Sequence, residues 1–110
     1  RSLGILDRIE GESLPPQFST EEIVTQMIEP LASPTRFQII QAVSSETKTF
    51  SELSQLTKLR GGNLLFHLRK LQEAGMVIQR HERGDYIITE KGFKILSAFL
   101  EAYASVQKGE

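Results

Sequence analysis

The sequence predicts a mainly α-helical domain that carries one small β-hairpin near its C-terminal end. Apolar residues recur at helical spacing in five segments, and two of these segments begin with a capping box. Two β-branched runs also flank a turn that contains glycine, which is the pattern of a hairpin. The length of 110 residues, with 39% hydrophobic and 25% charged residues, suits a single domain with one core.

The first 18 residues are predicted to form an arm appended to the domain. Leu3, Leu6 and Ile9 give the arm a short apolar stripe. The prolines at 15 and 16 end any helix there, because proline lacks an N–H and clashes with the preceding turn. An apolar stripe on so short a segment needs a partner surface.

Two helices are predicted after the arm, at about 20–29 and 34–44. Ser19 and Glu22 have the spacing of a capping box, in which the hydroxyl and the carboxylate satisfy free backbone donors at the helix start. The second helix begins at Ser33-Pro34, which combines a good N-cap with proline at the first helical position.

A short third helix is predicted at about 50–57 and a fourth at about 61–74, joined by a tight turn. Thr49 and Glu52 form a second capping box at the start of the shorter helix. Gly75 stands where the longer helix needs a left-handed C-terminal cap. Two helices around so short a turn make a helix-turn-helix.

The remaining segments predict a hairpin and a last helix. The apolar runs at 76–80 and 86–89 pair around a turn that contains Gly84. Thr89 then caps a final helix over 90–110.

This order of elements predicts a winged helix-turn-helix with appended N- and C-terminal helices. In that architecture a recognition helix, here about 61–74, enters the major groove of DNA, while the hairpin wing, here about 76–89, reaches the adjacent backbone. The single domain therefore divides into an arm at 1–18, a winged helix-turn-helix at 19–89 and a dimerisation helix at 90–110.

The distribution of charge along the chain agrees with a polyanion as partner. Residues 1–57 carry four basic and eight acidic side chains, whereas residues 58–94 carry eight basic and four acidic ones. The net charge of −1 conceals this contrast. The basic segment coincides with the predicted recognition helix and wing, although charge blocks of this kind also occur as solvated faces.

Several phrases of the sequence resemble the ArsR-type regulators of bacteria and archaea. They are LASPTR at 31–36 with Ile39-Ile40, FSEL at 50–53, HLRKLQEAGMV at 67–77 and YIITEKG at 86–92. The resemblance covers about residues 31–96 and is most specific over 67–77. It implies a homodimeric transcriptional regulator that binds operator DNA in a sequence-specific manner.

The opening of the recognition helix departs from that family's small polar residues. Gly61 and Gly62 either let backbone N–H groups approach a phosphate or simply form the tight turn. Asn63 is suited to an adenine edge, and Leu65, which stands where a serine usually faces DNA, to a thymine methyl. Leu65 and its neighbour Phe66 face DNA, a partner or the core, and their apolar character favours the core.

Basic side chains supply the remaining predicted contacts with DNA. Arg69 and Lys70 follow an apolar position of the recognition helix, and Arg83 lies at the tip of the wing. Arg36 pairs either with an acid or with phosphate, and His67 is more typical of a packed histidine. The predicted DNA-binding set is Arg60, Gly61, Gly62, Asn63, Leu65, Phe66, His67, Arg69, Lys70 and Arg83.

The final helix predicts a two-fold homodimer. Its apolar stripe is too wide for one small core to cover. The predicted dimer contacts are Leu3, Leu6, Ile9, Phe93, Leu96, Phe99, Leu100 and Tyr103. If the regulator senses a small molecule, we expect an apolar effector between the dimer helices, near Phe99 and Tyr103.

The sequence offers nothing for catalysis or for a metal. It contains no cysteine and only two histidines, which lie on separate predicted elements, so a non-metal-sensing member without a cofactor is expected. No nucleophile or phosphate-binding motif is present, and we expect no enzyme activity. Without an export-like or membrane-spanning segment, a cytoplasmic location is expected. The competing interpretation is a winged helix that binds another protein rather than DNA.

Overall fold

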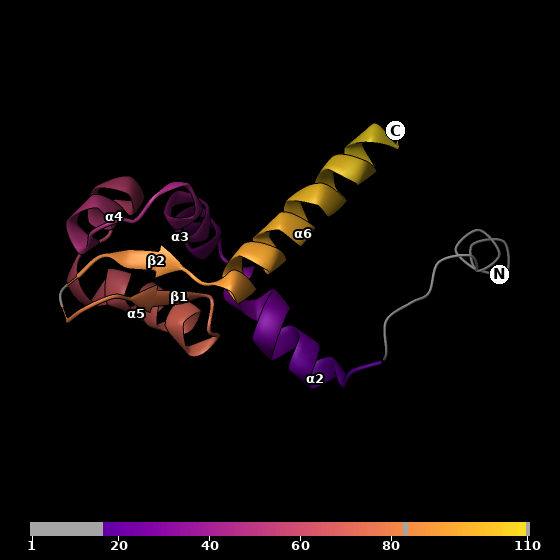
Figure 1. The fold of residues 1–110 in the computed structure, drawn as a ribbon, viewed down its shortest axis with the longest axis horizontal. Helices are drawn as coiled ribbons and strands as arrows, with labels where there is room; N and C mark the ends of the chain where they lie inside the picture. Colours follow the sequence, from indigo (N-terminus) through magenta and orange to yellow (C-terminus); the bar gives the residue numbers. More distant parts are fainter. Residues whose placement is uncertain (1–16, 83, 110) are drawn as a thin grey trace, which may run out of the picture.

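The computed structural model describes residues 17–82 and 84–109 (Figure 1). Its elements are α2 (Thr20–Ile23), η1 (Val24–Ile28), η2 (Glu29–Leu31), α3 (Pro34–Ser45), α4 (Phe50–Thr57), α5 (Gly61–Glu73), β1 (Val77–Gln79), β2 (Tyr86–Ile88) and α6 (Glu90–Lys108). This order confirms the predicted helical fold with a two-stranded hairpin. The arm residues Leu3, Leu6 and Ile9 lie outside the described residues.

The first helical segment is longer than predicted, because it continues through η1 and η2 beyond the expected end at 29. Its start has the expected capping box, in which Glu22 N–H donates to Ser19 Oγ at 3.0 Å and Ser19 N–H donates to Glu22 Oε1 at 3.3 Å. The α-helix passes into a π-helical turn and then into a 3₁₀ turn, with Pro30 in the first turn of η2. Proline is tolerated at that position because the first N–H groups of a helix lack intrahelical acceptors.

The hairpin is attached to the loop before α4. Its strands pair antiparallel, with Val77 opposite Ile88 and Gln79 opposite Tyr86. Lys48 forms an additional bridge to Tyr86, through N···O distances of 3.1 and 2.7 Å. These bonds fix the base of the wing relative to the helix-turn-helix.

The strands are slightly shorter than predicted, since the residues next to their ends also serve the neighbouring helices. Met76 N–H donates to Leu71 O at 3.0 Å. This N–H group therefore closes the end of α5 and does not pair with β2. Thr89 leaves β2 to cap α6, where its Oγ1 accepts from Gly92 N–H at 3.0 Å.

One core joins α3, α4, α5, the hairpin and the base of α6. Its buried apolar residues are Leu31, Ile39, Ile40, Val43, Leu53, Leu64, Leu68, Leu71, Ala74, Met76, Val77, Tyr86 and Leu96. Leu96 was expected on the dimer face, but it is only 3% exposed within its own chain. The first turns of α6 therefore pack on the core through Leu96, whereas Phe93, which is 54% exposed, and the more distal apolar residues of the helix remain available to a partner.

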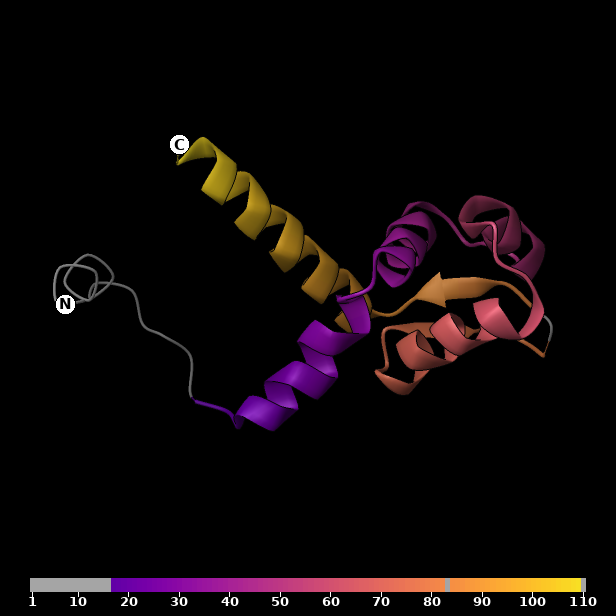
Figure 2. The same ribbon diagram turned by 180° about the vertical axis from the view of Figure 1, so that it is seen from behind.

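The C-terminal half of α6 projects away from the core. Figures 1 and 2 show α6 and α2 leaving the helix-turn-helix at the same end of the molecule and diverging from each other. Every described residue from 100 to 109 is exposed. A helix of two or three exposed turns gains most of its stability from packing, and residues 17–82 and 84–109 supply no surface that covers this half of α6.

Candidate nucleic-acid interface

The turn between α4 and α5 is built from residues with special backbone conformations. Lys58 caps α4 in the left-handed region, at φ 66°. Leu59 is half-buried, and its N–H donates to Thr57 Oγ1 at 3.2 Å. Gly61 is also left-handed, at φ 54°, which favours glycine because a side chain would crowd the backbone there.

The two glycines at the start of α5 differ in backbone conformation and in surroundings. The backbone conformation of Gly61 accounts for a glycine at that position. Gly62 does not have a positive φ, and a Cβ built on it meets no atom within 4 Å. Arg60, the N-cap of α5, makes no side-chain capping bond. The start of α5 is therefore uncovered beside Gly62 and has no side-chain cap, an arrangement that leaves room for an anion, although Asn63 N–H already donates to Arg60 O at 3.2 Å.

The helix α5 has one buried side and one exposed side. Leu64, Leu68 and Leu71 are fully buried in the core. The opposite side, which we call the outer face of α5, consists of Gly62, Asn63, Phe66, Arg69, Lys70 and Glu73. This division places the predicted polar and basic contacts on the side that a ligand can reach.

Phe66 corrects the expectation that the apolar pair would join the core. Its side chain is 53% exposed and lies near the middle of the outer face of α5. Leu65 is half-buried and lines a groove between α5 and the hairpin, together with Phe50 and Tyr86. The physical reason is helical geometry: Leu64 and Leu68 already occupy the buried stripe, and Phe66 lies two residues from each.

Neighbouring rings and charges hold Phe66 in place. The Nζ of Lys70 lies 5.6 Å from the centre of the Phe66 ring, within the range of a cation–π interaction. The ring of His67 meets it edge-on, with centroids 5.2 Å apart and planes at 75°. The exposed ring is therefore positioned by contacts on its own helix.

The cations of the turn and of α5 have no carboxylate partner within 4 Å among the residues that the structure describes. They are Lys58, Arg60, Arg69 and Lys70. Elsewhere the ion pairs are Arg36 with Glu29 at 3.4 Å, Lys48 with Glu46 at 2.9 Å, Arg80 with Asp85 at 3.1 Å and Lys94 with Glu90 at 3.3 Å. Four of the six described cations without a carboxylate partner thus lie around the recognition helix, where an external anion can neutralise them; the other two, Lys91 and Lys108, lie on α6.

Arg36 lies inside the protein rather than on the predicted DNA face. It is 7% exposed, and its Nε donates to Pro30 O at 2.7 Å. Its Nη2 bonds to the backbone and the carboxylate of Glu29, at 3.3 and 3.4 Å. The choice that the sequence left open for Arg36 is resolved in favour of these internal acceptors.

Arg36 also contacts His67, 31 residues away, with Nη1 3.1 Å from Nδ1. Arginine only donates, so Nδ1 accepts and the ring proton of the neutral histidine lies on Nε2. Burial, and next the charge of Arg36, lower the pKa of His67 below 6.5. Sequence reasoning missed this contact, since no local spacing relates residues so far apart.

The wing is anchored to the loop before α4. Arg80 and Asp85 pair across the hairpin, and Thr47 Oγ1 donates to Asp85 Oδ2 at 3.3 Å. Gln79 Nε2 donates to Gly84 O at 3.0 Å. The predicted contact residue Arg83 lies outside the described residues.

Among residues 17–82 and 84–109, no three or more His, Asp or Glu side chains come together in a group able to hold a metal ion. No helix in this part of the chain combines the length and the apolar composition that crossing a bilayer requires.

The chain is similar to one family model and to several solved structures. A family model described as a helix-turn-helix domain matches residues 31–80. The structure of NolR from Sinorhizobium fredii is similar at 26% identity and a TM-score of 0.63, over 81% of this chain and 97% of that one. A possible transcriptional regulator for arsenical resistance is similar at 28% identity and a TM-score of 0.58, over 71% and 83% of the two chains.

An ArsR family transcriptional regulator shares the fold at 19% identity, with a TM-score of 0.60 over 86% of this chain and 99% of that one. No curated protein sequence matches the chain significantly.

Proposed function

We propose that the chain is a DNA-binding transcriptional regulator of the ArsR type, which binds operator DNA as a homodimer; the matched helix-turn-helix domain and the similar solved structures support this proposal. In this proposal α5 enters the major groove and the β1–β2 hairpin contacts the adjacent backbone. The observation that carries the proposal is the unpaired positive charge around the exposed side of α5. A duplex gains affinity from such cations because they release its counterions.

Different residues on the outer face of α5 have different proposed contacts with DNA. Arg69 and Lys70 bind phosphate or an acceptor on a base edge in the major groove, and Asn63 reads an adenine edge. The open backbone at Gly62 lets a phosphate approach the start of the helix. Arg60 and the wing residue Arg83 add contacts with the DNA backbone.

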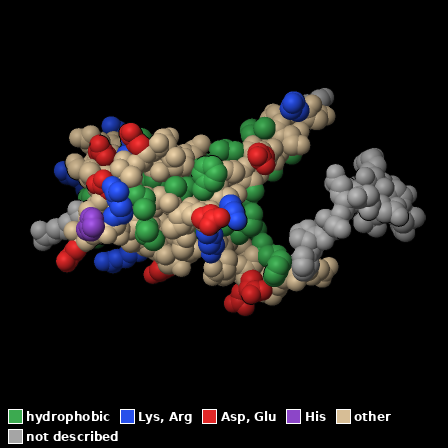
Figure 3. Space-filling view, in the orientation of Figure 1, with side chains coloured by type: hydrophobic (Ala, Val, Ile, Leu, Met, Phe, Trp, Pro, Cys, Tyr) green, Lys and Arg blue, Asp and Glu red, His purple; other side chains and the backbone are tan. Residues whose placement is uncertain are grey.

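The proposed dimer uses the apolar surfaces that the described residues leave uncovered. Phe93, Leu100, Tyr103 and Val106 of α6 are all exposed. On the α2–η1 segment the exposed apolar residues are Ile23, Val24 and Ile28. In Figure 3 the hydrophobic side chains follow α6 and α2 where they leave the core. Burying these side chains against a second copy stabilises α6 and removes the apolar surface from water.

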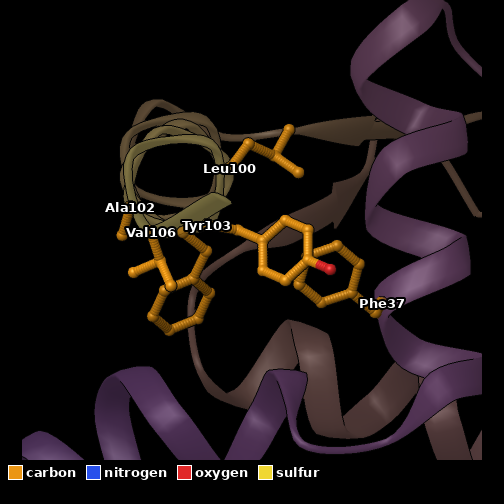
Figure 4. Close-up of a pocket in the computed structure, with 6 residues that line it drawn as sticks. Phe37, Leu100, Ala102, Tyr103 and Val106 are labelled. Carbon is orange, nitrogen blue, oxygen red and sulfur yellow. The ribbon is translucent and has the colours of Figure 1, made fainter. Parts of the chain in front are cut away.

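An open apolar groove of about 530 Å³ lies on this surface. It is lined by Phe37, Phe99, Leu100, Ala102, Tyr103 and Val106. Figure 4 shows Leu100 and Tyr103 of α6 on the side that faces Phe37 of α3. We place side chains of the second copy in this groove. An apolar effector, if the regulator responds to one, belongs at the same place, near Phe99 and Tyr103.

Titration of a fluorescent duplex at several salt concentrations tests the proposal. The dimer is expected to neutralise about six to eight phosphates, so the log–log salt slope should be about −5 to −7. Binding without a steep salt dependence, or no binding at low salt, favours the protein-interaction module instead. Because the dimer is two-fold, the preferred site should be an inverted repeat with half-sites about 10 base pairs apart, or a multiple of that.

A further inference from the structure

We infer that Phe66 reads the methyl group of a thymine in each operator half-site, an inference that rests on the proposed binding of DNA. The helix α5 has a continuous buried stripe without this residue, so the core does not explain a large exposed ring. An exposed aromatic side chain in the middle of a basic helix face calls for an apolar group on the ligand.

The space beside the ring is open on one side. Gly62 precedes Phe66 by one helical turn and carries no side chain, and nothing lies within 4 Å of where its Cβ would be. A shallow groove of about 450 Å³ runs along this side, lined by Gly62, Leu65, Phe66, Arg69, Lys70 and Glu73. A group as small as a methyl can therefore reach the ring without displacing any part of the protein.

The charges around the ring select the kind of ligand. The ammonium of Lys70 lies over the Phe66 ring, and Arg69 is on the same exposed side. A duplex satisfies both features, because its phosphates are anionic and its major groove contains apolar methyl groups. An apolar protein partner would leave the two cations unpaired, which disfavours it at this site.

Thymine is the base whose major-groove edge matches Phe66 and Lys70 together. It presents a C5 methyl next to the O4 acceptor, whereas cytosine presents an N4 amino donor and no methyl. Lys70 has only donors to offer, so it suits O4 and not the cytosine amino group. The contacts with His67 and Lys70 hold the ring before DNA arrives, which reduces the entropy cost of the contact.

The experiment begins with selection of binding sites from a randomised duplex library by the full chain. Each thymine of the selected half-site is then replaced in turn by deoxyuridine, which removes only the methyl group. At one position we expect the affinity of the wild-type protein to fall about fourfold per half-site, as expected for loss of one buried methyl. Phe66→Ala should bind the two duplexes equally.

A second pair of duplexes tests the methyl group in another base. With cytosine or 5-methylcytosine opposite guanine at the same position, the wild type should prefer the methylated duplex and Phe66→Ala should show no preference. Leu56→Ala is the matched control, because Leu56 is 41% exposed but lies on α4. This control should respond to both methyl groups as the wild type does.

The outcomes separate the inference from the function on which it rests. If the library yields no enriched sequence, sequence-specific DNA binding and the role of Phe66 both fail. If a site is enriched but the wild type tolerates deoxyuridine at every position, the inference is overturned and the proposed function stands. The same holds if Phe66→Ala remains as sensitive to the methyl group as the wild type. The deoxyuridine series on the wild type gives this answer even if the variant folds poorly.

Discussion

Nη1 of Arg36 lies 3.1 Å from Nδ1 of His67 and so joins the first turn of α3 to the middle of the recognition helix. The same guanidinium bonds to Pro30 O and to Glu29, in the 3₁₀ turn that ends the first helical segment. One buried cation thus sets the position of α5 relative to α3 and to the segment that leads to α2. Phe66 is next to His67 in the chain, and the two rings meet edge-on. The Arg36–His67 contact therefore also bears on the proposed DNA-binding face.

The first prediction concerns the pH dependence of stability. Because the pKa of His67 is lowered below 6.5 in the folded chain, the unfolded chain binds a proton there more readily than the folded one. The contribution of His67 to stability is therefore fully present above pH 6.5 and is lost as the pH falls from 6.5 through the lower folded pKa. Chemical denaturation measured across this range should show the loss.

The substitution His67→Asn should flatten that part of the profile, because Asn does not titrate while its Oδ1 can still accept from Arg36. The control is His81→Asn, which removes the other histidine, an exposed residue of the wing. We expect the control to leave the profile as it is in the wild type. A profile unchanged by His67→Asn would contradict the role given to the Arg36 contact.

The second prediction separates the two glycines that open α5. Gly61→Ala should destabilise the protein by about 1–2 kcal/mol, since an alanine side chain crowds the left-handed backbone. Gly62→Ala should instead stabilise it by about 0.4–1 kcal/mol, because the helix accepts alanine there and the unfolded chain loses freedom. Unfolding titrations of the two variants and the wild type measure both changes.

Binding of DNA supplies a further readout for the same pair. The methyl group of Gly62→Ala meets nothing in its own chain, so only an approaching phosphate would contact it. This variant should be more stable and yet bind DNA more weakly. Equal affinity of Gly62→Ala and the wild type would show that the backbone at 62 does not approach a phosphate.

Local signals in the sequence account for most of the fold. The capping boxes at Ser19 and Thr49 predicted helix starts that the structure places within one residue, because their hydrogen bonds are made within a single turn. The hairpin and its glycine turn were predicted for the same reason. Thr89 was predicted to cap the last helix, and its bond to Gly92 confirms this.

Features that depend on contacts between distant segments could not be predicted from the sequence. Phe66 was assigned preferentially to the core because composition alone does not say which side of a helix is already filled. Leu96 was assigned to the dimer face, but the first turns of α6 close over the core. The Arg36–His67 contact joins two helices whose approach is set by packing, and no periodicity in the sequence encodes it.

The third prediction concerns the charges of the outer face of α5. Arg69→Ala should weaken binding to all duplex sequences alike and reduce the log–log salt slope by about two in the dimer, or about one per lost phosphate contact. The control is Lys94→Ala, which removes a cation that pairs with Glu90 on α6. The control should leave the slope unchanged. If Arg69→Ala also leaves it unchanged, Arg69 does not contact phosphate.

The last prediction concerns assembly. Leu100 and Tyr103 are 44% and 67% exposed on the projecting half of α6. Leu100→Lys introduces a charge into the proposed interface, and burying it there without a partner is costly. The variant should sediment as a monomer at protein concentrations of about tens of micromolar, where a dimer of ordinary affinity persists. Ser105→Lys makes the same change of charge on the opposite side of α6 and should remain a dimer.

Loss of the dimer should also change how DNA is bound. A monomer presents one α5 helix and about half of the phosphate contacts, so the salt slope of Leu100→Lys should be about half that of the wild type. It should also lose its preference for an inverted repeat over a single half-site, because that preference comes from two helices held in fixed register. A wild-type chain that sediments as a monomer contradicts the proposed dimer. If instead Leu100→Lys stays dimeric and keeps the full slope, the two copies meet through a different face, and α6 projects for another reason.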